Sequence, residues 1–227
     1  MIHDRRKGLD RDQLTERIRQ ANKRLGDFGE NVVADYMHHE GWTQIYPDTL
    51  GLAMVAIGAQ KNVRESPERF LDRGFWRYVD DSVDDREAEQ EWELIQVKTT
   101  CVESSLSWVS ICWSAHRLEH ALRYTERAIS MIDYPGLSCP FPQRTKFQLY
   151  MVIPDGILSI DIIDIQKYSR RTNRSDILHI DRYACETVAN FDPDDHHRYV
   201  TICDERRHLQ KQKSRLERNP KQIELGV

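Results

Sequence analysis

The stretch from Trp92 to Thr100, WELIQVKTT, constrains the fold more than any other part of this chain. It predicts a short apolar strand in which two polar side chains, Gln96 and Lys98, stand two residues apart. Residues i and i+2 of a strand point to the same face of a sheet, so an amide and an ammonium group would project side by side. Two interpretations are open for this strand alone: an edge strand with Lys98 in solvent, or a strand that carries a site.

Composition limits the class of protein. A chain of 227 residues corresponds to one ordinary domain with extensions. The net charge of −4 argues against a uniformly basic nucleic-acid-binding surface, so any basic surface must be local. The five cysteines show no CxxC spacing, which predicts reduced thiols and no zinc site. No apolar run matches a signal peptide or a membrane span, which predicts a cytoplasmic protein without a membrane partner.

The two ends of the chain are basic. We expect a basic N-terminal helix over 1–25 and a basic terminal helix over 205–221, the latter closing a C-terminal extension that begins at 171. One interpretation is contact with a phosphate backbone or with a second subunit, and the other is a solvated helix face. The candidate nucleic-acid-binding residues are Arg19, Lys23, Arg24, Lys211 and Arg215.

Between these ends, hydrophobic periodicity predicts a core over 26–170. An acidic stretch over 59–91 reads as a polar insertion between two strands. Helices are expected over 25–42 and 115–133, with a short one near Lys167. Strands are expected at 43–47, 51–58, 92–100, 106–113, 147–153, 157–165, 177–180 and 199–202. This order predicts an α/β fold with a central mixed sheet flanked by helices.

The order of three short motifs adds a resemblance. Glu30 lies near the buried side of the first core helix, where a carboxylate needs a positive partner. Gly51-Leu52 follows at the start of an expected strand, and then Gln96-Val97-Lys98 on the next. Over about residues 25–155, this arrangement resembles the PD-(D/E)xK nuclease superfamily with its restriction-endonuclease-like core. The resemblance implies a Mg²⁺- or Mn²⁺-dependent endonuclease that hydrolyses phosphodiester bonds, with DNA favoured over RNA.

The resemblance also implies roles for single residues. Phosphodiester hydrolysis uses a divalent cation to polarise the phosphate, and Mg²⁺ takes oxygen ligands. By position, Gln96 would supply a side-chain oxygen and Val97 its carbonyl oxygen to the metal. Lys98 would stabilise the charge that develops on the phosphate. Glu30 would bind the metal through a water molecule or pair with Lys98.

One position departs from the family pattern. The pattern of the family that the chain resembles has a metal-binding aspartate where this chain has Ala53, after Gly51-Leu52. Alanine offers no oxygen, so the alignment predicts a severely impaired enzyme. Two explanations are open: an engineered inactive variant of a nuclease, or a natural pseudonuclease that serves as a nucleic-acid or protein binding module. Substitute ligands would be Asp48, Asp80 or Asp81.

A lone nuclease domain in the cytoplasm fits a bacterial defence or restriction-type effector, acting with partner proteins of such a system. Cutting both strands of a duplex takes two active sites, which favours a homodimer. A further interpretation is a structural subunit in which Lys98 lies in solvent far from Glu30. Neither a GxSxG elbow nor a GxxxxGK phosphate loop is present, so the sequence does not support a serine hydrolase or an NTPase.

Overall fold

The computed structural model describes residues 10–61, 71–79, 89–101, 107–134, 139–171 and 176–218. The chain divides into two compact units, one of Met1–Phe28 with Asp192–Val227 and the other of Gly29–Phe191. Helix α1 (Arg11–His39) contributes to both units, because the division falls within it. These boundaries differ from the expected ones after residues 25 and 170, since the two terminal helices belong to one unit.

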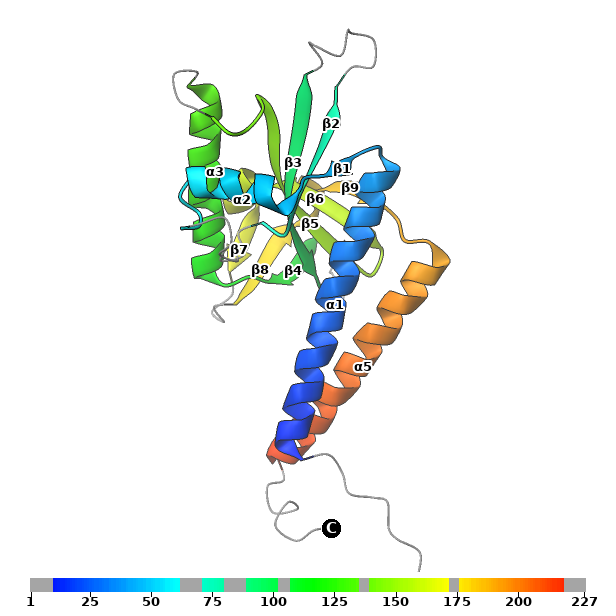
Figure 1. Ribbon diagram of the computed structural model, residues 1–227. Coiled ribbons are helices and arrows are strands. Elements are labelled where there is room, and N and C mark those ends of the chain that lie inside the picture. Colours follow the sequence, from blue (N-terminus) through cyan, green and yellow to red (C-terminus); the bar gives the residue numbers. More distant parts are fainter. Residues whose placement is uncertain are drawn as a thin grey trace, which may run out of the picture. The chain divides into compact units, whose positions relative to one another are not determined.

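The larger unit is built on a mixed six-stranded sheet, which confirms the predicted α/β class (Figure 1). The strand order is β1-β2-β3-β5-β6-β9, and β3 and β5 form the parallel pair while the other neighbours are antiparallel. The strands are β1 (Thr43–Gln44), β2 (Arg73–Tyr78), β3 (Gln90–Thr99), β5 (Arg144–Ile153), β6 (Gly156–Asp161) and β9 (Glu186–Ala189).

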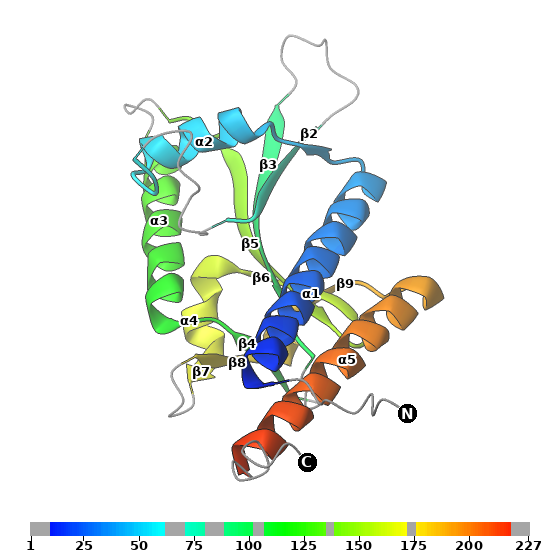
Figure 2. The same cartoon turned by 60° about the horizontal axis from the view of Figure 1, so that its bottom comes forward.

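A smaller sheet and several helices complete this unit. The second sheet has the order β4-β8-β7, formed by β4 (Trp108–Cys112), β8 (Ile177–Asp181) and β7 (Ser169–Arg171). The helices are α2 (Pro47–Ala56), α3 (Ala115–Asp133) and the short α4 (Ile165–Tyr168), with 3-10 turns at Ile162–Asp164 and Arg182–Ala184. Figures 1 and 2 show α2 and α3 beside one another on one side of the large sheet.

Strand β3 lies in the middle of the large sheet, between β2 and β5, and its residues 91–97 are buried. Trp92 and Leu94 face the main hydrophobic cluster, which includes side chains of α2 and α3. Glu93 and Thr99 therefore point to the other face, where Thr99 lies against Gly29 of α1. Because both faces of β3 are covered, the interpretation of WELIQVKTT as a solvated edge strand is wrong.

The expected strand over 51–58 is also wrong, because these residues belong mainly to helix α2. Pro47 occupies the first turn of that helix, where its missing N–H costs nothing, and Asp48 complements the helix dipole. A short apolar run such as GLAMVAIG suits a buried helix as well as a buried strand. Likewise, the expected strand over 199–202 lies inside helix α5 (Pro193–Arg218).

The stretch over 59–91 is not a simple insertion. Strand β2 lies within it, and Gln90 and Glu91 belong to β3. The proposed fallback ligands Asp80 and Asp81 lie outside the described residues. The expected helices over 1–25 and 25–42 are parts of one continuous helix, α1. The expected helix over 115–133 and the remaining strands of the core are confirmed within a few residues, and none of the five cysteines forms a disulfide.

In the smaller unit, the first part of α1 and helix α5 run antiparallel (Figure 2). Arg11 pairs with Glu217 at 4.0 Å, and Arg24 pairs with Glu205 at 2.6 Å. Leu14, Ala21 and Leu209 form a small apolar cluster between the helices. Among the helices of the described ranges, none has the length and hydropathy of a membrane span.

Candidate active site

A carboxylate that the sequence interpretation passed over, Asp72, lies beside Gln96. Arg73 pairs with Ile95 in the β2–β3 register, so the preceding residue, Asp72, faces Gln96. The backbone N–H of Asp72 donates to the carbonyl oxygen of Ile95 at 2.8 Å. Its Oδ2 accepts hydrogen bonds from the backbone N–H of Val97 at 2.7 Å and from Nε2 of Gln96. The Asp72 carboxylate is therefore fixed on β3 at the residues predicted to bind a metal.

Ala53, by contrast, lies in the hydrophobic core. Its side chain is 1% exposed and belongs to the apolar cluster around α2. The alignment that placed Ala53 at the position of an aspartate required a strand there, and that strand does not exist. Asp48, another suggested substitute, is exposed in the first turn of α2. The prediction of an inactive Asp-to-Ala variant thus loses its basis.

Gln96 is fully buried, at 0% exposure, and its two amide atoms have different surroundings. Nε2 donates to Asp72 and, at 3.4 Å, to the carbonyl oxygen of Val97. Oε1 has no hydrogen-bond partner among the residues that the structure describes, which is costly for a buried acceptor. A carboxylate oxygen, a carbonyl oxygen and an unsatisfied amide group therefore meet at one place, and these are the ligand types that Mg²⁺ prefers.

Clusters of other ligand types do not occur nearby. Among the described residues, no three His, Cys, Asp or Glu side chains gather where they could share a metal ion. A cation at Asp72 would therefore depend on the glutamine and backbone oxygens. This donor set fits a hard cation such as Mg²⁺ and does not suit zinc, which favours nitrogen and sulfur.

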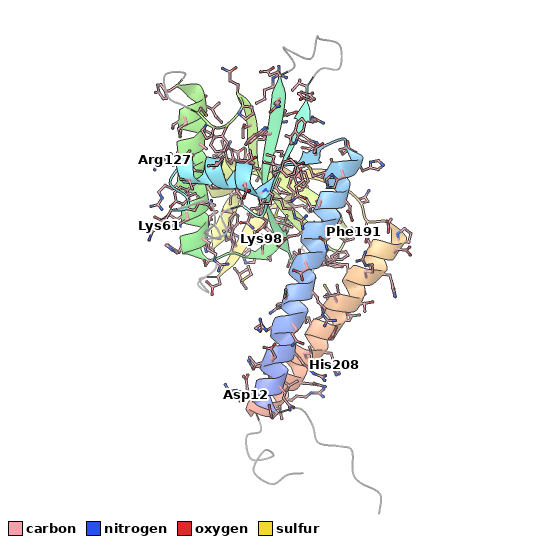
Figure 3. All side chains as sticks on the ribbon, viewed as in Figure 1. Asp12, Lys61, Lys98, Arg127, Phe191 and His208 are labelled. Atoms are coloured by element: carbon pink, nitrogen blue, oxygen red, sulfur yellow. The ribbon has the colours of Figure 1, made fainter. Side chains whose placement is uncertain are left out.

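Lys98 projects from the same face of β3 as Gln96, near the end of the strand (Figure 3). Burial lowers the pKa of its ammonium below the ordinary value, and Arg117 acts in the same direction. The carboxylates of Asp72 and Glu30 oppose this shift by favouring the charged form. Lys98 Nζ also lies 5.4 Å from the centre of the Trp113 ring. A partly desolvated ammonium thus lies within electrostatic range of the Asp72 carboxylate, and such perturbed groups gather at functional sites.

Glu30 approaches the strand because its neighbour is a glycine. A Cβ on Gly29 would lie 1.8 Å from Oγ1 of Thr99, so only glycine lets α1 come this close to β3. Oε2 of Glu30 lies 3.8 Å from Nη2 of Arg73. Glu30 therefore forms its ion pair with Arg73. On Lys98 it acts through its charge, which raises the pKa of the ammonium.

Arg117 is a second residue that the sequence interpretation missed. It lies in the first turn of α3, where Oγ of the N-cap residue Ser114 accepts its backbone N–H at 3.4 Å. Its side chain is exposed, yet its charge acts on Lys98. Ser114 is a typical N-cap residue, so the sequence did indicate that a helix begins there. That helix start places Arg117, three residues later, in the first turn of α3.

The predicted nucleic-acid-binding residues all belong to the smaller unit. Arg19 and Arg24 are engaged by carboxylates, with Glu16 at 2.8 Å and Glu205 at 2.6 Å. Lys23 is exposed on α1. Lys211 and Arg215 fall on one face of α5 with two further arginines and line a shallow groove. We call this set the α5 basic stripe; its members are Arg207, Lys211, Arg215 and Arg218.

No protein-family model, curated protein or solved structure matches this chain. The functional assignment therefore rests on the arrangement of the residues themselves.

Proposed function

We propose that this protein is a metal-dependent nuclease whose active site is formed by Asp72, Gln96, Val97 and Lys98. The observation that carries the proposal is the Asp72 carboxylate, held against Gln96 and Val97 within the electrostatic reach of Lys98. In the PD-(D/E)xK pattern, Asp72 takes the place of the strand aspartate for which the sequence resemblance offered only Ala53. The restriction-endonuclease-like core is part of the same proposal, supported by the mixed sheet and by α1 packing next to the site strand.

The residues fit a bound Mg²⁺ or Mn²⁺. Oδ2 of Asp72 and the carbonyl of Val97 both accept from the Gln96 amide nitrogen, so two oxygens already converge on one point. The two ends of a glutamine amide exchange places by a half-turn, which would bring the unsatisfied Oε1 to the same point. Asp72, Gln96 and Val97 are therefore the residues that would hold the cation, supplying oxygen ligands only.

Each group has a distinct role in phosphodiester hydrolysis. A divalent cation, when bound, polarises the phosphate and lowers the pKa of the attacking water. The Lys98 ammonium stabilises the negative charge that develops on the phosphate oxygens. Glu30 helps to keep Lys98 charged in its partly buried position. Arg117, exposed at the start of α3, binds a neighbouring phosphate and orients the strand.

The direct test is a cleavage assay on single- and double-stranded DNA and RNA with Mg²⁺ or Mn²⁺. We expect cleavage that EDTA abolishes and that Lys98→Ala reduces by at least about a hundredfold, as for loss of one electrostatic stabiliser. Lys61→Ala, which removes an exposed ammonium away from this strand, is the matched control and should retain activity. Wild-type rates in the Lys98→Ala protein, with EDTA-sensitive cleavage intact, would place the site elsewhere.

The alternative is a binding module without catalysis. This alternative was based on the absence of an aspartate at position 53. Asp72 supplies a carboxylate to the site, which removes that basis. The preference for DNA, the homodimer, the cytoplasmic address and the role in bacterial defence with partner proteins remain predictions. Nucleic-acid binding without cleavage by any metal-loaded preparation would favour the module.

A further inference from the structure

A polar cavity lies on the face of the large sheet opposite Gln96 and Lys98. It has a volume of about 290 Å³, and its walls come from the end of α1, from β2, β3, β5, β6 and β9, and from the turn after α1. Glu93 of β3 lines it, on the strand face that alternates away from Gln96. The proposed active site uses none of these residues.

Glu93 is a buried acid that forms no ion pair within the described part of the chain. Its residue is 7% exposed, and Oε1 accepts the hydroxyl of Tyr150 at 2.5 Å. Among the described residues, no lysine, arginine or histidine lies within ion-pair distance of Glu93. A buried carboxylate of this kind costs free energy unless it binds a proton or meets a positive charge.

The two cations in the walls are engaged elsewhere. Lys146 Nζ lies 2.8 Å from Oε1 of Glu91, and Arg77 Nη2 lies 3.0 Å from Oε2 of the same residue. Arg77 also lies over the Trp42 ring at 4.2 Å. Glu91, which lies beside the cavity, thus pairs with both cations, and neither of them forms an ion pair with Glu93.

Further negative charge surrounds Glu93. Glu40, from the turn after α1, and Glu186, on β9, line the same cavity. Both Glu93 and Glu186 act on the hydroxyls of Tyr36 and Tyr150 and raise the pKa of each, after burial as the larger cause. Counting Glu91 with its two cations, the glutamates exceed the cations by two, so the cavity is complementary to positive charge.

We propose that this cavity binds a small organic cation, an alkyl mono- or diammonium compound, with Glu93 as the carboxylate that receives the ammonium group. The cavity lies at the small end of ligand pockets, which suits a molecule of few heavy atoms. The further glutamates in its walls, Glu40 and Glu186, favour a cation over an anion. This site is independent of the nuclease chemistry on the other face of β3.

Binding of a cation to Glu93 should be coupled to the release of a proton. Burial raises the pKa of Glu93, with Glu91 adding to the shift, while the Tyr150 hydrogen bond, Lys146 and Arg77 oppose it. The carboxyl group therefore keeps its proton to higher pH than an exposed glutamate. A cation binds the ionised form, so binding releases a proton and tightens as pH rises through the pKa of Glu93. The other titratable groups facing the cavity are Glu40, Glu186 and the neutral hydroxyls of Tyr36 and Tyr150, together with Lys146 and Arg77, which pair with Glu91.

The experiment titrates the whole protein with butane-1,4-diammonium and with butane-1,4-diol, an uncharged molecule of the same length. NMR shifts of residues on β3 and β5 report binding, and calorimetry in two buffers of different ionisation enthalpy reports proton release. We expect saturable binding of the diammonium only, with release of a proton. Glu93→Gln, which preserves shape and an acceptor for Tyr150, should weaken binding at least about tenfold.

Glu89→Gln is the matched control, because it removes the same charge at an exposed residue just before β3. It should change the affinity by no more than about twofold, as expected for a screened surface charge. The proposal is overturned if the diol binds as well as the diammonium, if Glu93→Gln binds like the wild type, or if the wild type shows no saturable binding. Because the measurement contains no nucleic acid and no metal, these outcomes say nothing about cleavage.

Discussion

The carboxylate of Asp72 accepts a hydrogen bond from the backbone N–H of Val97 at 2.7 Å, although 25 residues separate the two along the chain. The antiparallel pairing of β2 with β3 creates this contact. It brings a negative charge to Gln96 and into the electrostatic environment of Lys98. The proposed active site depends on that hairpin and not on helix α2.

The first prediction concerns Ala53→Asp. Because Ala53 is 1% exposed among apolar side chains, an aspartate there would bury an unpaired carboxylate. We expect the free energy of unfolding to fall by at least about 2 kcal/mol, measured by urea denaturation. Asp48→Ala, at an exposed position of the same helix, serves as control and should cost little. A gain of metal-dependent cleavage in the Ala53→Asp protein would revive the inactive-variant hypothesis.

Two glycines of α1 provide a matched pair of substitutions. Gly29→Ala should destabilise the protein by about 1–3 kcal/mol, because its Cβ would lie 1.8 Å from Thr99 Oγ1 and must displace β3 or the helix. Gly26→Ala meets no atom within 4 Å and should stabilise the helix by about 0.5–1 kcal/mol. Thermal unfolding of both variants measures the difference. Equal effects of the two substitutions would mean that α1 does not approach the strand at Gly29.

The pH dependence of cleavage should report Lys98. Its ammonium is required in the charged form, and burial lowers its pKa below the ordinary value of 10.5 despite the opposing carboxylates. Activity is therefore present below this lowered pKa and is lost as pH rises through it. Lys98→Arg keeps its charge at any accessible pH, so the alkaline decline should move to higher pH. An alkaline limb at the same pH in both proteins would show that another group titrates.

The α5 basic stripe should contribute to nucleic-acid binding. Its four cations recur at steps of four, four and three residues, which places them on one face of the helix about 5–6 Å apart. Lys211→Gln should reduce the slope of log affinity against log salt by about one, the effect of one lost phosphate contact. Lys213→Gln lies off this face and should leave the slope unchanged. The same slope change in both variants would assign the effect to net charge alone.

Much of the core could be predicted from the sequence because its elements are locally encoded. Apolar spacing predicted α3 with its observed bounds, and the strands expected over 147–153 and 157–165 correspond to β5 and β6. In β3, the alternation of Gln96 and Lys98 with apolar residues correctly indicated a shared face. Each of these features depends on neighbours within a few residues.

The site could be predicted only in part, because its main carboxylate is defined by long-range pairing. Asp72 lies in a charged stretch whose composition resembles a loop, and nothing local indicates that β2 pairs with β3. The apolar segment of α2 fitted the expected strand better than the charged segment around Asp72 did, because periodicity does not separate a short buried helix from a buried strand. Gln96, Val97 and Lys98 were therefore identified correctly as neighbours, while their acidic partner was sought on the wrong element.

The most direct test of the central claim is the binding of Mn²⁺ to the wild type and to Asp72→Asn, measured by electron paramagnetic resonance. Asparagine keeps an oxygen to accept the Val97 N–H but removes the charge. We predict that the wild type binds Mn²⁺ and that Asp72→Asn weakens binding at least about tenfold without loss of the fold. Equal Mn²⁺ affinity in the two folded proteins, or no binding by the wild type, would contradict the assignment of Asp72 as the metal-binding carboxylate.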